Sequence, residues 1–165
     1  MKNKKPILGI TMGDPSGIGP EIAAKTLAKK KIYDMCRPII VGDANVMVQA
    51  IKITGVDLKV NRVYNVGDAL FRYGTMDVYD LKNTDMEQLV YGKVSAMAGK
   101  AGFEAVKKVI ELALHGEIDA TITGPINKEA MNLAGFHYSG HTEIYAHYTK
   151  TKNYTMMLAC GSLRV

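Results

Sequence analysis

Apolar and polar positions along the chain predict short buried strands, each followed by an amphipathic helix. The first apolar run, Pro6 to Met12, leads into a glycine-rich stretch and then into a helix that begins at Pro20 or Glu21. Proline fits the first helical position, and a carboxylate there is stabilised by the exposed amide groups. The order strand, glycine loop, helix is typical of the first unit of a parallel α/β sheet.

The same alternation continues beyond the first helix. Short apolar runs between stretches of helical periodicity predict further strands and helices. The longest helix follows Ser95, whose side chain can cap it, and ends at His115 and Gly116. The chain is therefore expected to belong to the α/β class, with a parallel sheet. The expected strands span residues 38–41, 58–64, 76–81 and 118–123, and the expected helices span residues 44–53, 96–114 and 127–133.

The last residues, Thr155 to Val165, form an apolar stretch that predicts a strand or a hairpin. A native terminus is usually polar or held in place by contacts. We therefore expect the chain to be part of a longer gene product.

Composition excludes several classes of protein. Hydrophobic residues make up 47% and charged residues 22% of the chain, and no apolar run approaches the roughly 20 residues that a membrane-spanning helix needs. The basic start, Met1 to Lys5, is not followed by the cleavage pattern of a secretory signal, so we expect a cytoplasmic protein with no membrane partner. Cys36 and Cys160 form neither a CxxC motif nor a disulfide framework, and both are expected to be buried, reduced thiols.

The net charge of +5 permits attraction to phosphate-bearing partners but specifies none. The densest basic run, Lys29 to Lys31, falls where the first helix is expected to end, and cations there complement the helix dipole. No interleaved aromatic residues or nucleic-acid motif accompany this run. We therefore expect no nucleic-acid partner.

The first candidate site is the glycine-rich stretch after the first strand. Gly13, Gly17 and Gly19 permit close backbone approach, and the following helix presents free amide groups to an anion or a cofactor. The stretch matches neither the GxGxxG fingerprint nor a P-loop, so taken alone it is better explained as a tight turn. If it binds a cofactor, Asp14 and Gly17 are the expected contacts.

A second polar stretch, Thr121 to Glu129, runs from the end of a strand into a helix. The carboxyl edge of a parallel sheet is where α/β proteins bind ligands. Asn127 can simply cap the helix, whereas Lys128 places a cation in the first helical turn, where the dipole disfavours it. Lys128 therefore points to a ligand more strongly than Asn127 does.

A third stretch, Ser139 to Glu143, places His141 and Thr142 side by side at the start of a helix. Both side chains can donate hydrogen bonds to a carboxylate or phosphate, and an imidazole can exchange a proton near neutral pH. The alternative is a helix cap with an uninvolved histidine. His137 and His141 have the HxxxH spacing but no third ligand is evident, so we expect no metal site within this chain.

Taken together and in this order, these stretches resemble the 4-hydroxythreonine-4-phosphate dehydrogenase family, including its D-threonate and D-erythronate 4-phosphate dehydrogenase paralogues. The resemblance covers essentially the whole chain. Its first motif is also similar to the glycine loop of isocitrate and isopropylmalate dehydrogenases, which the family resembles in fold. The resemblance to the 4-hydroxythreonine-4-phosphate dehydrogenase family rests on Gly13–Glu21, Thr123–Glu129 and Gly140–Glu143, and Gly92–Ser95 and Met156–Leu158 also fit it.

The resemblance implies a three-layer α/β/α fold of the isocitrate/isopropylmalate dehydrogenase type, incomplete because only the amino-terminal half is present. Residues 1–125 are then part of a first α/β domain. Residues 126–165 are the start of a second domain that provides dimerisation and substrate contacts.

The resemblance also implies the activity of the parent enzyme. Family members oxidise the secondary alcohol of a phosphorylated hydroxy acid with NAD, a divalent metal (Zn, Mg or Co) polarises the oxygen, and the β-keto acid can decarboxylate. They are homodimers, so the expected partners are a small phosphorylated substrate and a second copy of the chain. His141 and Thr142 match the family's substrate-contacting pair, and Asn127 and Lys128 match its signature near the cleft.

The chain departs from the family in length. The metal-binding histidines, the phosphate-binding lysine and arginine, and most NAD contacts of the family follow the point where this chain ends, so we expect this chain alone to be inactive. Gly124, Asn127 and Ser139 do not decide between 4-phosphooxy-threonine and the 4-phosphates of D-threonate or D-erythronate. The alternative function is a non-catalytic module that binds a phosphate ligand or dimerises.

Overall fold

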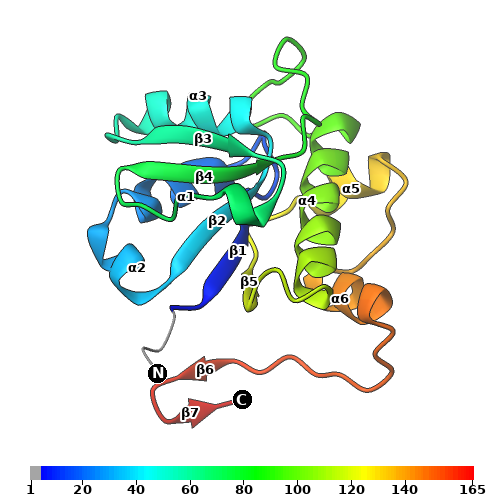
Figure 1. Cartoon of the computed structure of the whole chain (residues 1–165). Coiled ribbons are helices and arrows are strands. Elements are labelled where there is room, and N and C mark those ends of the chain that lie inside the picture. Colours follow the sequence, from blue (N-terminus) through cyan, green and yellow to red (C-terminus); the bar gives the residue numbers. More distant parts are fainter. Residues whose placement is uncertain (1–4) are drawn as a thin grey trace.

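A parallel sheet of five strands forms the centre of the protein in the computed structural model, which describes residues 5–165 (Figure 1). The strand order is β3-β4-β2-β1-β5, and every neighbouring pair runs parallel. The strands are β1 (Ile7–Thr11), β2 (Arg37–Gly42), β3 (Lys59–Val63), β4 (Thr75–Asp80) and β5 (Ala120–Ile122).

Helices cover both faces of this sheet, so the predicted three-layer α/β/α arrangement is confirmed. Ile40 of β2 packs in one cluster with Leu27 and Met47 of the helices α1 and α3. Its neighbour Ile39 packs on the opposite face with Val109 of α4. Successive residues of a strand point to opposite faces, and both faces are buried, so β2 is apolar from Pro38 to Val41. The helices are α1 (Gly19–Leu27), α2 (Lys30–Met35), α3 (Ala44–Thr54), the 3-10 helix η1 (Val66–Asp68), α4 (Ala96–Leu114), α5 (Lys128–Leu133) and α6 (His141–Thr149).

Local signals place the helix ends close to their predicted positions. Pro20 lies in the first turn of α1, and the Ser95 hydroxyl accepts a hydrogen bond of 3.2 Å from the Ala98 amide at the start of α4. Gly55 ends α3 in the left-handed conformation that favours glycine. The sequence did not predict α2: the lysine run was expected at the end of α1, but α1 ends at Leu27 and Lys30 begins a new short helix.

Helix α4 carries two glycines that allow other segments to approach its axis closely. A Cβ atom on Gly99 would lie 2.1 Å from the carbonyl carbon of Ala130, so α5 crosses α4 at this point. A Cβ atom on Gly102 would lie 3.3 Å from the carbonyl oxygen of Gly13, where the loop after β1 rests on the helix. These contacts hold both α5 and the glycine-rich loop in place.

Residues 126–149 pack on the outer side of α4. Met131 of α5 and Ile144 of α6 share a buried cluster with Phe103 of α4, and Phe136 stacks on Phe103 with ring centroids 3.9 Å apart. The proposed division of the chain at residue 125 into two domains stays a prediction.

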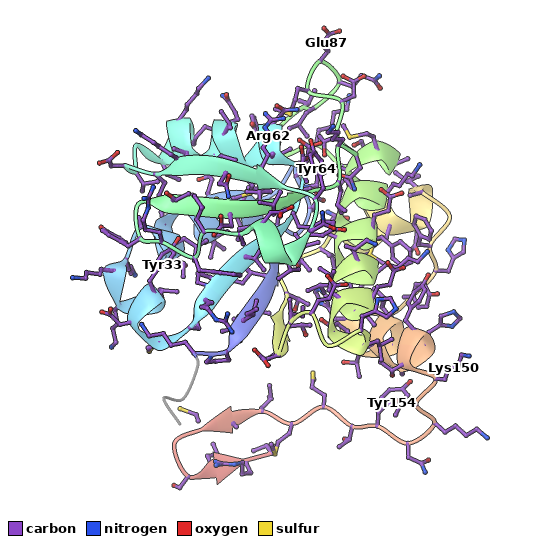
Figure 2. The ribbon with its side chains drawn as sticks, viewed as in Figure 1. Tyr33, Arg62, Tyr64, Glu87, Lys150 and Tyr154 are labelled. Atoms are coloured by element: carbon purple, nitrogen blue, oxygen red, sulfur yellow. The ribbon has the colours of Figure 1, made fainter. Side chains whose placement is uncertain are left out.

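The chain after α6 forms an extended arm that ends in a small hairpin, as the sequence predicted (Figures 1 and 2). Its strands β6 (Ala159–Cys160) and β7 (Leu163–Arg164) are antiparallel, and residues 151–165 are exposed. Cys36 is buried but Cys160 is exposed, so the expectation of a buried thiol is wrong for Cys160. Among the described residues, no helix is long and apolar enough to cross a membrane.

Candidate functional site

The topology of the sheet indicates that a ligand binds at the carboxyl ends of its strands. The chain leaves β1 through α1 on one face of the sheet and reaches β2, and it crosses from β4 to β5 through α4 on the opposite face. The loops after β1 and β5 therefore diverge to opposite sides of the sheet. In open parallel sheets, ligands bind at the carboxyl ends of strands at such a switch point.

These two loops are bonded directly to each other, which brings the first two predicted stretches together. The Asp14 amide donates to the Pro125 carbonyl oxygen at 2.9 Å, and the Gly124 amide donates to Oγ1 of Thr11 at 2.9 Å. Gly13 has a φ of +77°, and a Cβ atom there would lie 2.4 Å from the Pro125 carbonyl oxygen. Gly13 is thus required by the contact between the loops.

The predicted cofactor contacts lie in the first of these loops. Asp14 is buried, its Oδ1 accepts a hydrogen bond of 2.7 Å from the Ser16 amide, and burial raises the pKa of its carboxyl against the opposing effect of that hydrogen bond. The Ser16 hydroxyl is buried with no hydrogen-bond partner among residues 5–165. Gly17 is exposed at the tip of the loop. The contact of Asp14 and Gly17 with a cofactor stays a prediction.

The second loop leads into α5. Asn127 caps this helix, because its Oδ1 accepts a hydrogen bond of 3.0 Å from the Ala130 amide. Lys128 is the first residue of α5 and is exposed to solvent. The capping role that the sequence allowed for Asn127 is therefore present, and Lys128 is free to reach a ligand.

His141 begins α6 and lies against the same loop. Its imidazole contacts the backbone of Gly124 and is half-buried, and its Nε2 is buried without a hydrogen-bond partner among the described residues. Burial lowers the pKa of His141, and the Gly124 backbone opposes this effect in part. The lowered pKa favours the neutral form of the imidazole. The adjacent Thr142 is partly buried.

We define the candidate site as the Gly124-to-Lys128 loop together with His141 and Thr142. The structure brings the second and third predicted stretches together, since the loop that contacts His141 continues into Asn127 and Lys128. No single residue of the candidate site identifies it as a catalytic centre. What it offers is a set of polar groups around a neutral imidazole at the carboxyl edge of the sheet.

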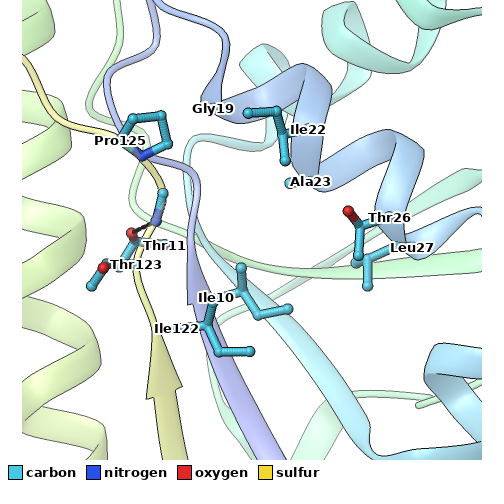
Figure 3. A pocket seen from close by; sticks show the side chains of 11 residues that line it. Ile10, Thr11, Gly19, Ile22, Ala23, Thr26, Leu27, Ile122, Thr123 and Pro125 are labelled. Carbon is cyan, nitrogen blue, oxygen red and sulfur yellow. Dashed lines mark hydrogen bonds between the residues drawn. The ribbon is translucent and has the colours of Figure 1, made fainter. Parts of the chain in front are cut away.

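A separate cavity of about 330 Å³ lies between α1 and the strands β1 and β5 (Figure 3). Its lining is mostly apolar, with Ile10, Ile22 and Ile122 among the contributors, and it borders Gly124 and Pro125 from the side of α1. None of His141, Thr142, Asn127 and Lys128 lines it. The cavity therefore adjoins the candidate site without containing its polar side chains.

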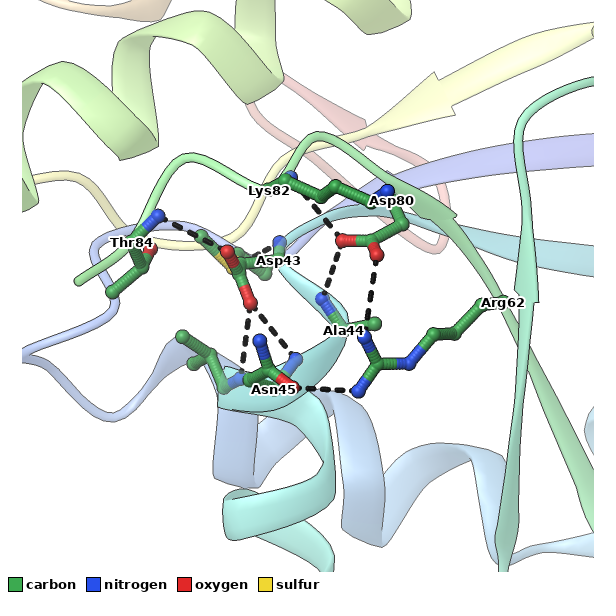
Figure 4. Close-up of polar contacts among 9 residues, drawn as sticks. Asp43, Ala44, Asn45, Arg62, Asp80, Lys82 and Thr84 are labelled. Atoms are coloured by element: carbon green, nitrogen blue, oxygen red, sulfur yellow. Dashed lines mark hydrogen bonds and ion pairs between the residues drawn. The ribbon is translucent and has the colours of Figure 1, made fainter. Parts of the chain in front are cut away.

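Two buried carboxylates at the same edge of the sheet have a structural role (Figure 4). Asp43 caps α3 and also accepts a hydrogen bond of 3.0 Å from the Thr84 amide. Asp80 accepts from the Ala44 amide at 3.0 Å and pairs with Arg62 at 3.6 Å. Sequence reasoning missed this network because its members come from separate parts of the chain, and backbone amides occupy three of the four carboxylate oxygens while Oδ2 of Asp80 faces Arg62.

No group of three or more histidine, cysteine, aspartate or glutamate residues gathers within residues 5–165 in a way that would hold a metal ion.

Comparison with known proteins gives consistent matches along the chain. Residues 34–165 match the family model described as "Pyridoxal phosphate biosynthetic protein PdxA". A Clostridium botulinum protein named as a D-threonate 4-phosphate dehydrogenase is 45% identical over 165 residues, which is 100% of this chain and 49% of that protein. A Symbiobacterium thermophilum protein of the same name is 47% identical over 161 residues, covering 98% of this chain and 48% of that protein.

Solved structures show the same relationship. The 4-hydroxythreonine-4-phosphate dehydrogenase from Burkholderia phymatum has a TM-score of 0.93 and 41% identity, covering 98% of this chain and 49% of that chain. The enzyme of the same name from Klebsiella pneumoniae has a TM-score of 0.90 and 35% identity, covering 99% of this chain and 50% of that chain. The chain thus spans about half the length of the proteins that it matches.

Proposed function

This chain belongs to the PdxA family, and from that membership we propose that it forms part of a dehydrogenase for a phosphorylated four-carbon hydroxy acid. The proposed reaction is oxidation of the secondary alcohol with NAD and a divalent metal, followed by decarboxylation. The names of the relatives support a dehydrogenase acting on a 4-phosphorylated substrate. The single structural observation that carries the proposal is the position of His141 against Gly124.

The candidate site is suited to a polar, anionic substrate. The contact with the Gly124 backbone uses the one N–H of a neutral His141, so Nε2 can accept a hydrogen bond from a substrate hydroxyl, and a protonated ring can also donate to a carboxylate or a phosphate. The exposed ammonium group of Lys128 adds a positive charge. In this proposal His141, Thr142, Asn127 and Lys128 contact the substrate and provide one wall of its pocket.

NAD has a proposed contact region in this chain, whereas the divalent metal has none among the described residues. NAD supplies the acceptor for the hydride, and the uncapped start of α1 next to Asp14 and Gly17 is the part of this chain that we propose contacts it. The described residues do not supply a metal site, so no step is assigned to a metal here. We further propose that the protein acts in the cytoplasm and forms a homodimer. Light scattering of the purified protein measures its molar mass and checks the homodimer.

D-threonate 4-phosphate is the first substrate to test. The Clostridium and Symbiobacterium relatives that carry its name are 45% and 47% identical to this chain. The solved 4-hydroxythreonine-4-phosphate dehydrogenases are 41% and 35% identical. D-erythronate 4-phosphate and 4-phosphooxy-threonine are the other two substrates to test.

The proposal predicts NADH formation by the complete gene product that contains this sequence when one of these acids and a divalent metal are supplied. The variant His141→Asn is expected to lower kcat/KM by about tenfold, since a lost hydrogen bond to the substrate costs about 0.5 to 1.5 kcal/mol. His147→Asn is the matched control, because His147 is exposed on the same helix and its ring lies beside the rings of Tyr138 and Tyr148. Its activity should match the unaltered protein.

Absence of NADH formation with all three acids and added Zn, Mg or Co would contradict the proposed activity. Saturable binding of a phosphorylated acid without turnover would instead favour the non-catalytic binding module.

A further inference from the structure

A hydroxyl pair ties α6 to the sheet beside the candidate site. The hydroxyl of Tyr145 donates a hydrogen bond of 2.7 Å to Oγ1 of Thr121 in β5. Among residues 5–165 it is the only hydrogen bond between two side chains that joins α6 to the sheet. Burial raises the pKa of Tyr145, so its hydroxyl remains a donor throughout the neutral range.

Tyr145 lies one helical turn after His141, so both side chains project from the same face of α6. Thr121 lies in β5, and Gly124 lies in the loop that continues from it. Tyr145 thus contacts the strand while His141 contacts the loop. Two contacts one turn apart fix the rotation of the helix about its axis, which a single contact does not.

Apart from the contact of His141 with Gly124, the start of α6 has little polar support within residues 5–165. Its N-cap residue is Gly140, which has no side chain to bond the first amides. The helix is also weakly apolar, with Ile144 and Ala146 as its buried residues. Ile144 anchors the helix through apolar packing, and the Tyr145 hydroxyl adds the polar side-chain contact that joins it to β5 one turn from His141.

We propose that Tyr145 and Thr121 are positioning residues, whose hydrogen bond holds the imidazole of His141 against Gly124 in the orientation that receives the substrate. This inference rests on the proposed function, in which His141 contacts a phosphorylated hydroxy acid. Tyr145 and Thr121 themselves do not touch the substrate in this account.

The test uses the complete gene product that contains this sequence, with the variants Tyr145→Phe, Thr121→Val and the double variant. Each removes the hydrogen bond while keeping the ring or the branched shape. Tyr148→Phe is the matched control, because Tyr148 packs near Phe103 on the side of α4 and makes no bond to β5. The first readout is the titration of the His141 ring, followed by NMR, and the second is the Kd for D-threonate 4-phosphate.

Each single variant should move the pKa of His141 upward toward the ordinary value of 6.5, because burial is the main cause that lowers it and a loosened ring is better solvated. D-threonate 4-phosphate should bind about threefold to tenfold more weakly, the effect expected from one lost hydrogen bond. The double variant should equal either single variant, because both remove the same bond. Tyr148→Phe should leave the pKa and the Kd unchanged.

An unchanged His141 titration in Tyr145→Phe and Thr121→Val overturns the positioning role, whatever the ligand result. Additive effects in the double variant overturn it as well. If the unaltered protein binds none of the three phosphorylated acids, the proposed function fails, and the titration still decides whether the hydroxyl pair positions the ring.

Discussion

Replacing Gly13 with alanine is expected to lower the free energy of unfolding by about 3 kcal/mol, since two costs add. A left-handed backbone conformation costs a residue with a Cβ atom about 1 to 2 kcal/mol, and Gly13 has a φ of +77°. The new Cβ atom would also lie 2.4 Å from the Pro125 carbonyl oxygen. Relieving such overpacking costs about 1 to 3 kcal/mol because the obstacle is backbone.

Urea unfolding followed by circular dichroism measures this change. Gly17→Ala is the matched control, because Gly17 lies in the same loop and its nearest neighbour would be 3.5 Å from the added Cβ atom, an ordinary contact. The control should change stability by about 0.5 kcal/mol or less. Equal stability of the two variants would show that the loops after β1 and β5 do not touch as described.

The second large effect is expected at the crossing of α4 and α5. Alanine in place of glycine inside a helix gains about 1 kcal/mol of helix propensity. At Gly99 the added Cβ atom would lie 2.1 Å from both backbone carbonyl atoms of Ala130. The helices would have to separate and the contact cost exceeds the gain, so Gly99→Ala should lose about 2 kcal/mol of stability.

Gly102→Ala provides the comparison for this prediction. It lies in the same helix and gains the same propensity, but its Cβ atom would be 3.3 Å from its nearest neighbour. We expect its free energy of unfolding to stay within about 1 kcal/mol of the unaltered chain. Thermal and urea unfolding of both variants measure the difference, and a Gly99→Ala protein as stable as Gly102→Ala would refute the close crossing.

Much of the fold could be predicted from the sequence because the signals are local. Apolar runs of strand length separated by helical periodicity located every strand of the main sheet. Pro20, Ser95 and Gly116 marked helix ends through their own conformational and hydrogen-bonding preferences. The short helix α2 was missed, because the lysines that begin it were interpreted as the end of α1.

The candidate site was predicted as three stretches, but the contacts within it were not. The bond between Tyr145 and Thr121 joins residues from a helix and a strand that no local pattern relates. The Asp80 and Arg62 pair likewise depends on the order of β3, β4 and β2 in the sheet. Gly99 and Gly102 were a usable signal, since two glycines inside a long helix indicate that other backbone approaches it closely.

The central claim is that His141, Thr142, Asn127 and Lys128 form one wall of a pocket for a phosphorylated hydroxy acid. Its most direct test is to titrate D-threonate 4-phosphate into the isotope-labelled chain and to follow the backbone amide signals by NMR. The account predicts saturable shifts confined to residues 123–129 and 140–143 and to the adjoining loop after β1. Shifts spread over the lysines at the surface, or none at the highest concentration, would contradict it.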